Sequence, residues 1–251
     1  MGFFYVFIRN DSDEYLTNTA IAFISYEVAD EWWRAMSGHA EWCKLIERVS
    51  PRLYIYRFQY GMKIDGLNSL YNHALSERTF PQFKSHVLRL GDHCQPEDIR
   101  TAVQDSVDLA SGNSFFIRSK AEPYDYWFCP TSFGSITAGT KIYTSREERT
   151  RFRVRIADAQ MAPGTIMIGS DEIVVSLAFA PDLQVSVENG VVVAESAGAG
   201  ADAAKLKLSD VRAGFASGGR RRVVDDQNDS DIVVKELIEA KDGSGEGWEL
   251  V

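Results

Sequence analysis

A dense series of short predicted strands is the strongest constraint on how this chain folds. From residue 115 to about residue 212, runs of aromatic and β-branched residues alternate with turn formers such as "APG", "SDE" and "ENG". Such closely spaced strands are typical of antiparallel sandwiches and barrels. The clearest hairpin is "VENGVVV", because Asn-Gly suits a two-residue turn that needs positive φ. The predicted strands are FFIRS, YWFC, SITA, RFRVRI, TIMIG, EIVVSL, LQVSV, VVVAES and KLKLSDV.

Two sections with helical periodicity interrupt this pattern. Residues 28–49 carry apolar side chains at helical spacing, although Gly38 can break this section into two pieces. Residues 61–111 have the same spacing, and there "CQPEDIR" has a Pro and two acidic residues suited to a first turn. Between them, "LYIYRF" at 53–58 indicates a strand. We therefore predict a mainly β protein, α+β by content, with a helical insert.

Two segments more than a hundred residues apart open in the same way. "FYVFIRNDSDEYL" (4–16) and "FFIRSKAEPYDYWF" (115–128) each run from an aromatic strand through Ile-Arg and a polar turn into another aromatic segment. We interpret them as equivalent strand pairs of a repeated β scaffold, in which residues 115–156 have the size of one β-trefoil leaf. The predicted regions are a first β leaf with an inserted helix (1–60), a helical insert (61–114), antiparallel β leaves (115–214), and a polar loop with closing strands (215–251).

The segment "FIRNDSDEYL" resembles the opening of ricin-B-like and related β-trefoil lectins, in which an aromatic or aliphatic strand, an Asn, a turn with Ser and a Tyr-Leu pair recur. This resemblance implies a β-trefoil-like antiparallel barrel or sandwich and a lectin-like, carbohydrate-binding function. The Gln-x-Trp signature of those lectins is absent, because none of the five tryptophans has a Gln two residues before it. The resemblance therefore supports the scaffold and transfers no binding residue.

Candidate ligand-binding residues come from the chemistry of the turn "EPYDYWF" at 122–128. An aromatic ring can stack on the apolar face of a pyranose while a carboxylate accepts hydrogen bonds from its hydroxyls. Adjacent Trp32 and Trp33 point about 100° apart on a helix, so one of them faces away from the core. We predict binding of carbohydrate or another small polar molecule. The alternative is that the aromatic residues of the turn fill the core. The predicted ligand-binding residues are Glu122, Tyr124, Asp125, Tyr126, Trp127 and Trp33.

A second hypothesis is an enzyme that acts on a small molecule in a cleft between the β scaffold and the helical insert. The segment "HVLRLGDHC" brings His86, Asp92, His93 and Cys94 close in sequence, and such groups serve as acids, bases or nucleophiles. Their spacing matches neither C-x-x-C nor H-x-x-x-H, so we predict no metal site and no cofactor. A third hypothesis is a protein-interaction scaffold.

Composition and charge limit the partners that we expect. Apolar residues make up 45% and charged residues 25% of the chain, as in folded globular domains. The net charge of −9 disfavours polyanions, so we predict no nucleic-acid partner, and in "REERTRFRVRIAD" (146–158) we expect the glutamates to pair with the arginines.

No stretch approaches a membrane span or a signal-peptide apolar region, so we expect no membrane partner. The three cysteines do not suggest a disulfide framework, and we expect a cytoplasmic location. The sequence leaves the oligomeric state open.

Overall fold

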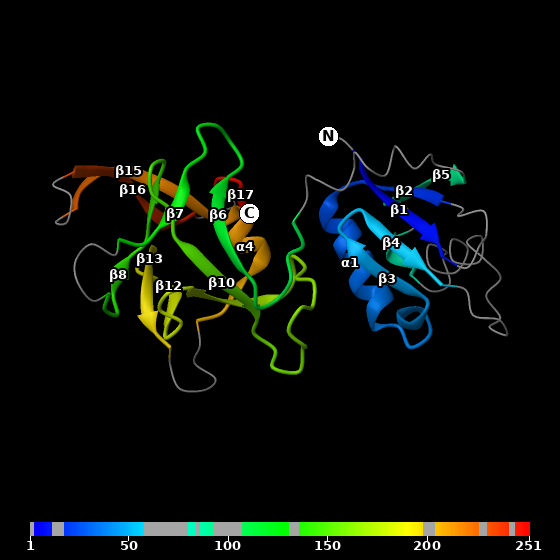
Figure 1. Cartoon of the computed structure of the whole chain (residues 1–251). Coiled ribbons are helices and arrows are strands. Elements are labelled where there is room, and N and C mark those ends of the chain that lie inside the picture. The colour runs from blue at the N-terminus through cyan, green and yellow to red at the C-terminus, as the bar shows by residue number, and fades with distance from the viewer. Residues whose placement is uncertain are drawn as a thin grey trace. The chain divides into compact units, whose positions relative to one another are not determined.

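The chain divides after Asp108 into two compact units, Met1–Asp108 and Leu109–Val251. A computed structural model describes residues 3–11, 18–57, 80–83, 86–92, 107–130, 136–197, 204–225, 230–240 and 244–251. Large, mostly antiparallel sheets dominate both units (Figure 1), which confirms the prediction of a mainly β protein. None of the helices within these ranges is long and apolar enough to cross a bilayer.

The first unit is a five-stranded sheet with a helix packed on it. The strand order is β3-β4-β1-β2-β5, in which β1 pairs antiparallel with β2 and parallel with β4. Helix α1 contacts β1, β2 and β3 (Figure 1). The elements are β1 (Phe4–Asn10), β2 (Asn18–Phe23), α1 (Tyr26–Gly38), η1 (Trp42–Lys44), β3 (Ile46–Ser50), β4 (Leu53–Tyr56), η2 (Pro81–Phe83) and β5 (Val87–Asp92).

Helix α1 begins at a side-chain cap and buries one face. The Ser25 hydroxyl accepts a hydrogen bond from the Val28 backbone N at 3.3 Å. Ala29, Trp32 and Met36 are buried at helical spacing, and the Trp32 ring stacks on Tyr54 with 5.8 Å between ring centroids. The helix ends at Gly38, the position at which the sequence allows a break. No second α-helical piece follows, because the apolar residues beyond Gly38 belong to η1 and β3.

A buried guanidinium ties the helix of the first unit to its sheet. The Arg48 side chain on β3 is 4% exposed and lies 2.8 Å from Asp30 Oδ1 on α1 and 2.6 Å from Asp108 Oδ1. It also donates to the Tyr54 hydroxyl at 3.1 Å. Burial raises the pKa of Tyr54 and keeps that hydroxyl neutral.

We expect Arg48→Met to lower the free energy of unfolding of the first unit by about 3–5 kcal/mol, because it leaves the buried Asp30 carboxylate without its cation. Urea unfolding followed by tryptophan fluorescence measures the change. Arg57→Met is the matched control, since Arg57 pairs with Glu47 at an exposed position and its loss costs under about 1 kcal/mol. Equal losses in the two variants would contradict the role assigned to Arg48.

The second unit is a twelve-stranded sheet whose hydrogen-bonded path returns to itself. The order is β15-β16-β9-β7-β6-β10-β11-β12-β13-β8, and β16 also pairs with β13 through Val191 and Ile238. The final strand, β17, pairs with β6. The elements are β6 (Ser114–Ser119), β7 (Tyr126–Phe128), β8 (Thr140–Lys141), β9 (Tyr143–Ser145), β10 (Arg151–Ile156), β11 (Glu172–Leu177), β12 (Leu183–Glu188), β13 (Val191–Ser196), β14 (Leu206–Lys207), α4 (Leu208–Ala213), β15 (Phe215–Asp225), β16 (Ser230–Glu239) and β17 (Trp248–Leu250).

Aromatic residues from four different strands fill the core of the second unit. The Trp127 ring on β7 makes edge contacts with Phe152, Phe215 and Trp248, with ring centroids 6.0, 5.2 and 6.0 Å away. All four side chains are buried. This cluster joins β7, β10, β15 and β17 into one core, since edge-to-face aromatic pairs add stability beyond the area that they bury.

The predicted Asn-Gly hairpin is confirmed. Strands β12 and β13 pair antiparallel from Leu183↔Ser196 to Glu188↔Val191, and Asn189 and Gly190 have φ of 52° and 80°. Positive φ at both positions is the geometry of a type I′ turn.

Gly190→Ala should lower the free energy of unfolding of the second unit by about 1 kcal/mol, because an added Cβ disfavours positive φ. Gly219→Ala is the matched control, since a Cβ at Gly219 meets nothing within 4 Å and its φ is not in the positive range. Thermal unfolding of both variants checks this. A Gly190→Ala protein as stable as the control would argue against the turn geometry.

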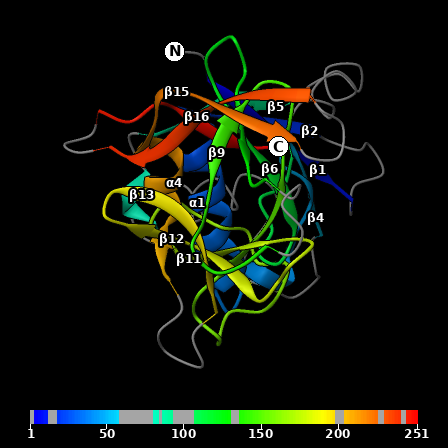
Figure 2. The same ribbon diagram turned by 90° about the vertical axis from the view of Figure 1, so that its left-hand side faces the viewer.

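Several predicted elements differ in the structure. Residues 215–225, predicted as part of a polar loop, form strand β15, which pairs with β16 in a long ribbon that Figure 2 shows. The closing strands predicted in "DIVVKEL" and "GWELV" are present as β16 and β17. Backbone pairing along the whole of β15 overrides its Gly- and Arg-rich composition. The segment "KLKLSDV" is the short strand β14 followed by helix α4, and the segments "SITA" and "TIMIG" form no strand in their described residues. Within the predicted helical insert 61–114, residues 87–92 are the strand β5, while residues 61–79 and 93–106 lie outside the described ranges.

The two similar openings belong to different sheets. Strand β1 pairs with β2 and β4 in the first unit, whereas β6 pairs with β7, β10 and β17 in the second. The interpretation of residues 1–60 as a leaf of the same scaffold as residues 115–214 is therefore corrected. A shared pattern of aromatic strand and polar turn encodes a local strand pair, and non-local contacts decide which sheet that pair joins.

Candidate functional site

A group of polar residues lies where three strands of the second unit meet. Strand β9 pairs with β7 on one side and β16 on the other, which places Trp127, Thr144 and Lys235 opposite one another. Directly opposed residues share a face of the sheet, and Lys235 shares its face of β16 with the buried Leu237. The polar group therefore lies on the core-facing side, where the core ends.

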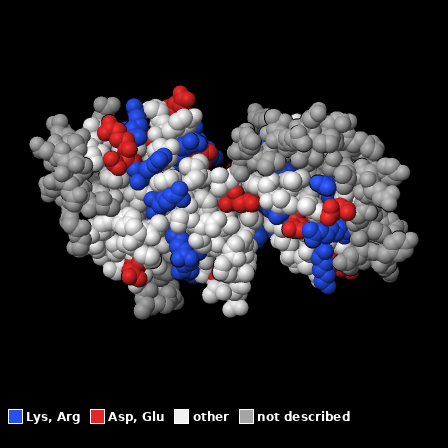
Figure 3. Space-filling model, viewed as in Figure 1, with Lys and Arg blue, Asp and Glu red and all other residues white. Residues whose placement is uncertain are grey.

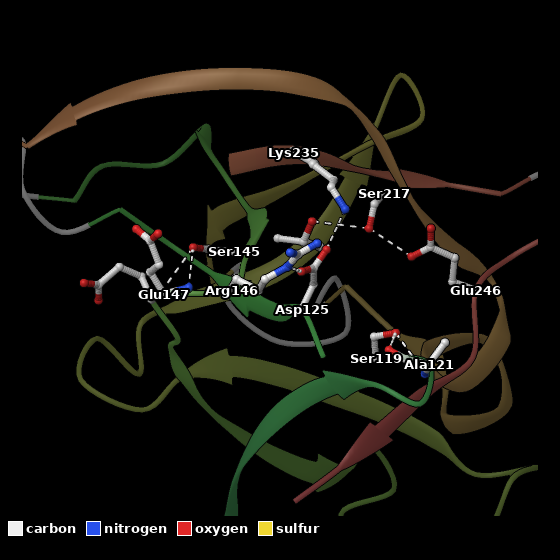
Figure 4. A network of polar contacts seen from close by, with 11 residues as sticks. Ser119, Ala121, Asp125, Ser145, Arg146, Glu147, Ser217, Lys235 and Glu246 are labelled. Atoms are coloured by element: carbon white, nitrogen blue, oxygen red, sulfur yellow. Dashed lines mark hydrogen bonds and ion pairs between the residues drawn. The ribbon is translucent and has the colours of Figure 1, made fainter. Parts of the chain in front are cut away.

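Asp125 is the central acidic group of this site. It precedes β7, in a turn closed by a 2.8 Å hydrogen bond from the Ser119 backbone N to its carbonyl. Its side chain is 10% exposed, with Oδ2 2.6 Å from Lys235 Nζ and Oδ1 3.1 Å from Arg146 Nε. Figure 4 shows both cations converging on this carboxylate. Two positive charges satisfy one buried negative charge.

Hydroxyl groups form a further set of polar contacts beside Asp125. Thr144 Oγ1 lies 3.3 Å from Ser217 Oγ, which in turn donates to Glu246 Oε2 at 2.9 Å (Figure 4). The Ser145 hydroxyl accepts hydrogen bonds from the backbone N of Glu147 at 3.3 Å. Strands β9 and β15 and the segment before β17 thus contribute a chain of polar contacts beside the Asp125 ion pairs.

A pocket of about 180 Å³ opens at this network. Its walls present the Asp125 carboxylate held between two cations, a second carboxylate on Glu147 and two hydroxyls, so it offers both hydrogen-bond donors and acceptors. The cations are more exposed than the carboxylate, since the Arg146 and Lys235 side chains are 56% and 32% exposed. The arrangement can bind a small ligand that both donates and accepts hydrogen bonds. The lining residues are Asp125, Thr144, Ser145, Arg146, Glu147, Val233 and Lys235.

The predicted ligand-binding residues of 122–127 separate into different environments. Asp125 lines the pocket, whereas Trp127 is fully buried in the core, as the alternative interpretation of that turn held. Tyr124 is 42% exposed beneath the Arg118 guanidinium, and Tyr126 is half-buried. Glu122 is exposed and forms a cis peptide bond with Pro123.

Trp33 lies in the first unit and lines a different hollow. This hollow has a volume of about 440 Å³ and also includes Cys43, Arg48 and Arg57. The Trp33 ring packs against Tyr54 with 5.2 Å between centroids, while Trp32 is buried beside it. The pair therefore divides as the helical geometry predicts, with Trp32 inside and Trp33 at the edge of the core.

Of the residues proposed for the enzyme hypothesis, the structure describes only two. His86 is half-buried, and its Nδ1 lies 3.0 Å from the Gln82 carbonyl O. Asp92 is the last residue of β5 and pairs with Thr19, while His93 and Cys94 lie outside the described ranges. Among the described residues, no three His, Cys, Asp or Glu side chains come together as they would to hold a metal ion.

The sequence analysis did not select Arg146, Lys235, Thr144 or Ser145. Lys235 is 110 positions from Asp125, and only the pairing of β16 with β9 brings the two together. A usable signal was the single Lys within the apolar run "DIVVKELI", because a charged residue there needs a partner.

A scan against protein-family models found no match, and a search of curated proteins found no similar sequence.

The two described cysteines should differ strongly in reactivity. Cys129 follows β7, its backbone N donates to Thr150 Oγ1 at 2.9 Å, and burial raises the pKa of its thiol to about 12. Cys43 is exposed. Under native conditions at neutral pH we expect iodoacetamide to modify Cys129 more than about a hundredfold more slowly than Cys43. Peptide mass spectrometry measures both rates, and denaturant should abolish the difference. Equal native rates would contradict the packing around β7.

Proposed function

We propose that the second unit is a binding module for a monosaccharide-sized carbohydrate or another small polar molecule, held in the pocket at Asp125. The observation that carries this proposal is the buried Asp125 carboxylate, which two partly exposed cations hold at a pocket lined with hydroxyls. A polyol can donate to the carboxylate and accept from Lys235 and Arg146 at the same time.

The energetics of this ion pair favour a role in binding. Burying the Asp125 carboxylate costs several kcal/mol of hydration, and water screens its attraction to two partly exposed cations, so these ion pairs are weak contributors to stability compared with apolar packing. Their polar atoms can instead orient a ligand, since binding sites combine a concave shape with a few fixed polar groups. Asp125 is fixed by burial, whereas Arg146 and Lys235 keep exposed surface that a ligand can contact.

The size of the pocket limits the ligand. Its volume of about 180 Å³ is well below the roughly 300–1,000 Å³ of sites for drug-sized ligands. A single sugar unit, or the terminal unit of a glycan, is the class of ligand that this space suits.

The lectin-like scaffold is part of the same proposal, with the β-trefoil-like arrangement confined to the second unit. The pairing of β6 with the final strand β17 and the return of the strand path through β13 and β16 support it. The hypothesis of an enzyme in a cleft beside a helical insert has no comparable support in the described residues.

Ligand-detected NMR against a panel of neutral and anionic monosaccharides tests the proposal on the full chain. We expect at least one sugar to bind, and Asp125→Asn to weaken its binding by more than about tenfold, because a hydrogen bond to a charged group contributes roughly 1.5–3 kcal/mol. Lys235→Met should also weaken the binding of that sugar.

The matched control is Asp182→Asn, at an exposed position before β12. It removes the same charge and should leave binding unchanged. Circular dichroism confirms that each variant is folded. If no sugar binds the unmodified protein, or if Asp125→Asn and Asp182→Asn behave alike, the proposal fails.

A further inference from the structure

Four arginines form a continuous row on the outside of the second unit. In β10, Arg151, Arg153 and Arg155 are exposed while Phe152, Val154 and Ile156 between them are buried. Arg149, just before the strand, continues the alternation, because Thr150 is also buried. In Figure 3, blue side chains run in a column over the part of this unit where Figure 1 shows β6, β7 and β10. We call Arg149, Arg151, Arg153 and Arg155 the arginine strip.

The arginine strip has no carboxylate partner within the described part of the chain. Arg153 Nε donates to the Gly112 carbonyl at 3.1 Å and Arg151 to the Ser114 carbonyl at 3.3 Å, so backbone oxygens hold two of these side chains along the sheet. The expected ion pairs with Glu147 and Glu148 do not form, although both glutamates are described. The strip is therefore a local concentration of positive charge that no carboxylate of the described residues neutralises by a direct ion pair.

Aromatic rings lie beside the strip on the neighbouring strands. Arg149 and Arg151 each place the guanidinium carbon 4.6 Å from the Phe116 ring centroid, and Arg149 lies 5.7 Å from the Tyr126 ring. Phe116 and Tyr126 contact each other edge to face at 6.3 Å. The guanidinium carbons lie over these rings, and a guanidinium is itself a planar surface on which a base can stack.

We propose that the arginine strip binds single-stranded nucleic acid along β10. Every second residue of a strand faces the same side, about 6.7 Å apart, a spacing close to that of successive phosphates in an extended single strand. Arginine contacts phosphate with two parallel hydrogen bonds, and aromatic and guanidinium planes stack on bases without regard to sequence.

The observations favour this ligand over a sugar at the same face. A pyranose stacks its C–H groups on an uncovered aromatic ring, whereas guanidinium groups already lie over Phe116, Tyr126 and Tyr124. The net charge of −9 predicts no nucleic-acid partner for the protein as a whole. Phosphate binding depends on the local potential, however, and here the fold gathers the arginines on one face.

Fluorescence anisotropy with a labelled oligothymidylate of about 15 nucleotides, a length within known site sizes, tests the proposal on the full chain. We expect binding that weakens linearly on a log–log plot against KCl concentration. Arg153→Gln/Arg155→Gln should weaken binding several-fold and reduce the magnitude of the salt slope by about 1.4, because each of the two lost phosphate contacts lowers the slope by about 0.7 on a single strand. Neither arginine contacts an aromatic ring among the described interactions, so the substitutions leave the packing of the sheet intact.

Lys205→Gln/Lys207→Gln is the matched control, since it removes two exposed positive charges on the β14 side of the same unit. It should keep the affinity and the slope of the unmodified protein. Duplex DNA and heparin serve as competitors at equal charge concentration and should compete less well than unlabelled oligothymidylate. Absence of binding, an equal effect of the lysine variant, or tighter binding of heparin or duplex would overturn the proposal. Asp125→Asn should leave oligonucleotide binding unchanged, so this result is independent of the sugar test.

Discussion

The backbone pairing of β16 is the constraint on which the second unit depends. This strand pairs with β15 along its length, with β9 through Val234–Glu236 and with β13 through Ile238. Without it, β9 would lose one neighbour and the strand path would not return through β13. Because Lys235 lies within the segment that pairs with β9, the same hydrogen bonds that close the sheet also bring a cation to Asp125. Fold and site therefore share one structural element.

The elements that the sequence predicts correctly are those whose signals are local. The alternation in "RFRVRI" gives both the strand β10 and its buried face, and Asn-Gly gives the β12–β13 turn. The residue pattern of β15 gives no such signal, because glycines and consecutive arginines have low β-propensity. Its strand exists because β16 offers hydrogen-bond partners along its length, and no property of residues 215–225 alone contains that information.

The same distinction explains which part of the site was predictable. Asp125 could be selected, because a carboxylate in an aromatic turn is a chemical signal within a few residues. Lys235 and Arg146 could not be assigned to it, since their proximity follows from the order of strands β7, β9 and β16. Trp127 was selected as a ligand-binding residue but is buried in the core. An aromatic residue suited to sugar stacking is equally suited to a core, so the sequence alone does not distinguish the two roles. The two similar openings at residues 4–16 and 115–128 have the same limit, since each specifies a strand and a turn but not the sheet to which they belong.

The net charge of the protein and the charge on the outer face of β10 have opposite signs. The chain as a whole is acidic, yet β10 turns its arginines outward and its apolar residues inward because strand side chains alternate. Glu147 and Glu148, which lie between Arg146 and Arg149 in sequence, follow a turn in which the Ser145 hydroxyl accepts their backbone N–H groups. Their proximity in sequence therefore does not produce ion pairs with the strip, and the positive charge of β10 remains on one face. Residue totals set the average field, but strand periodicity and turn geometry determine the local field that a ligand meets.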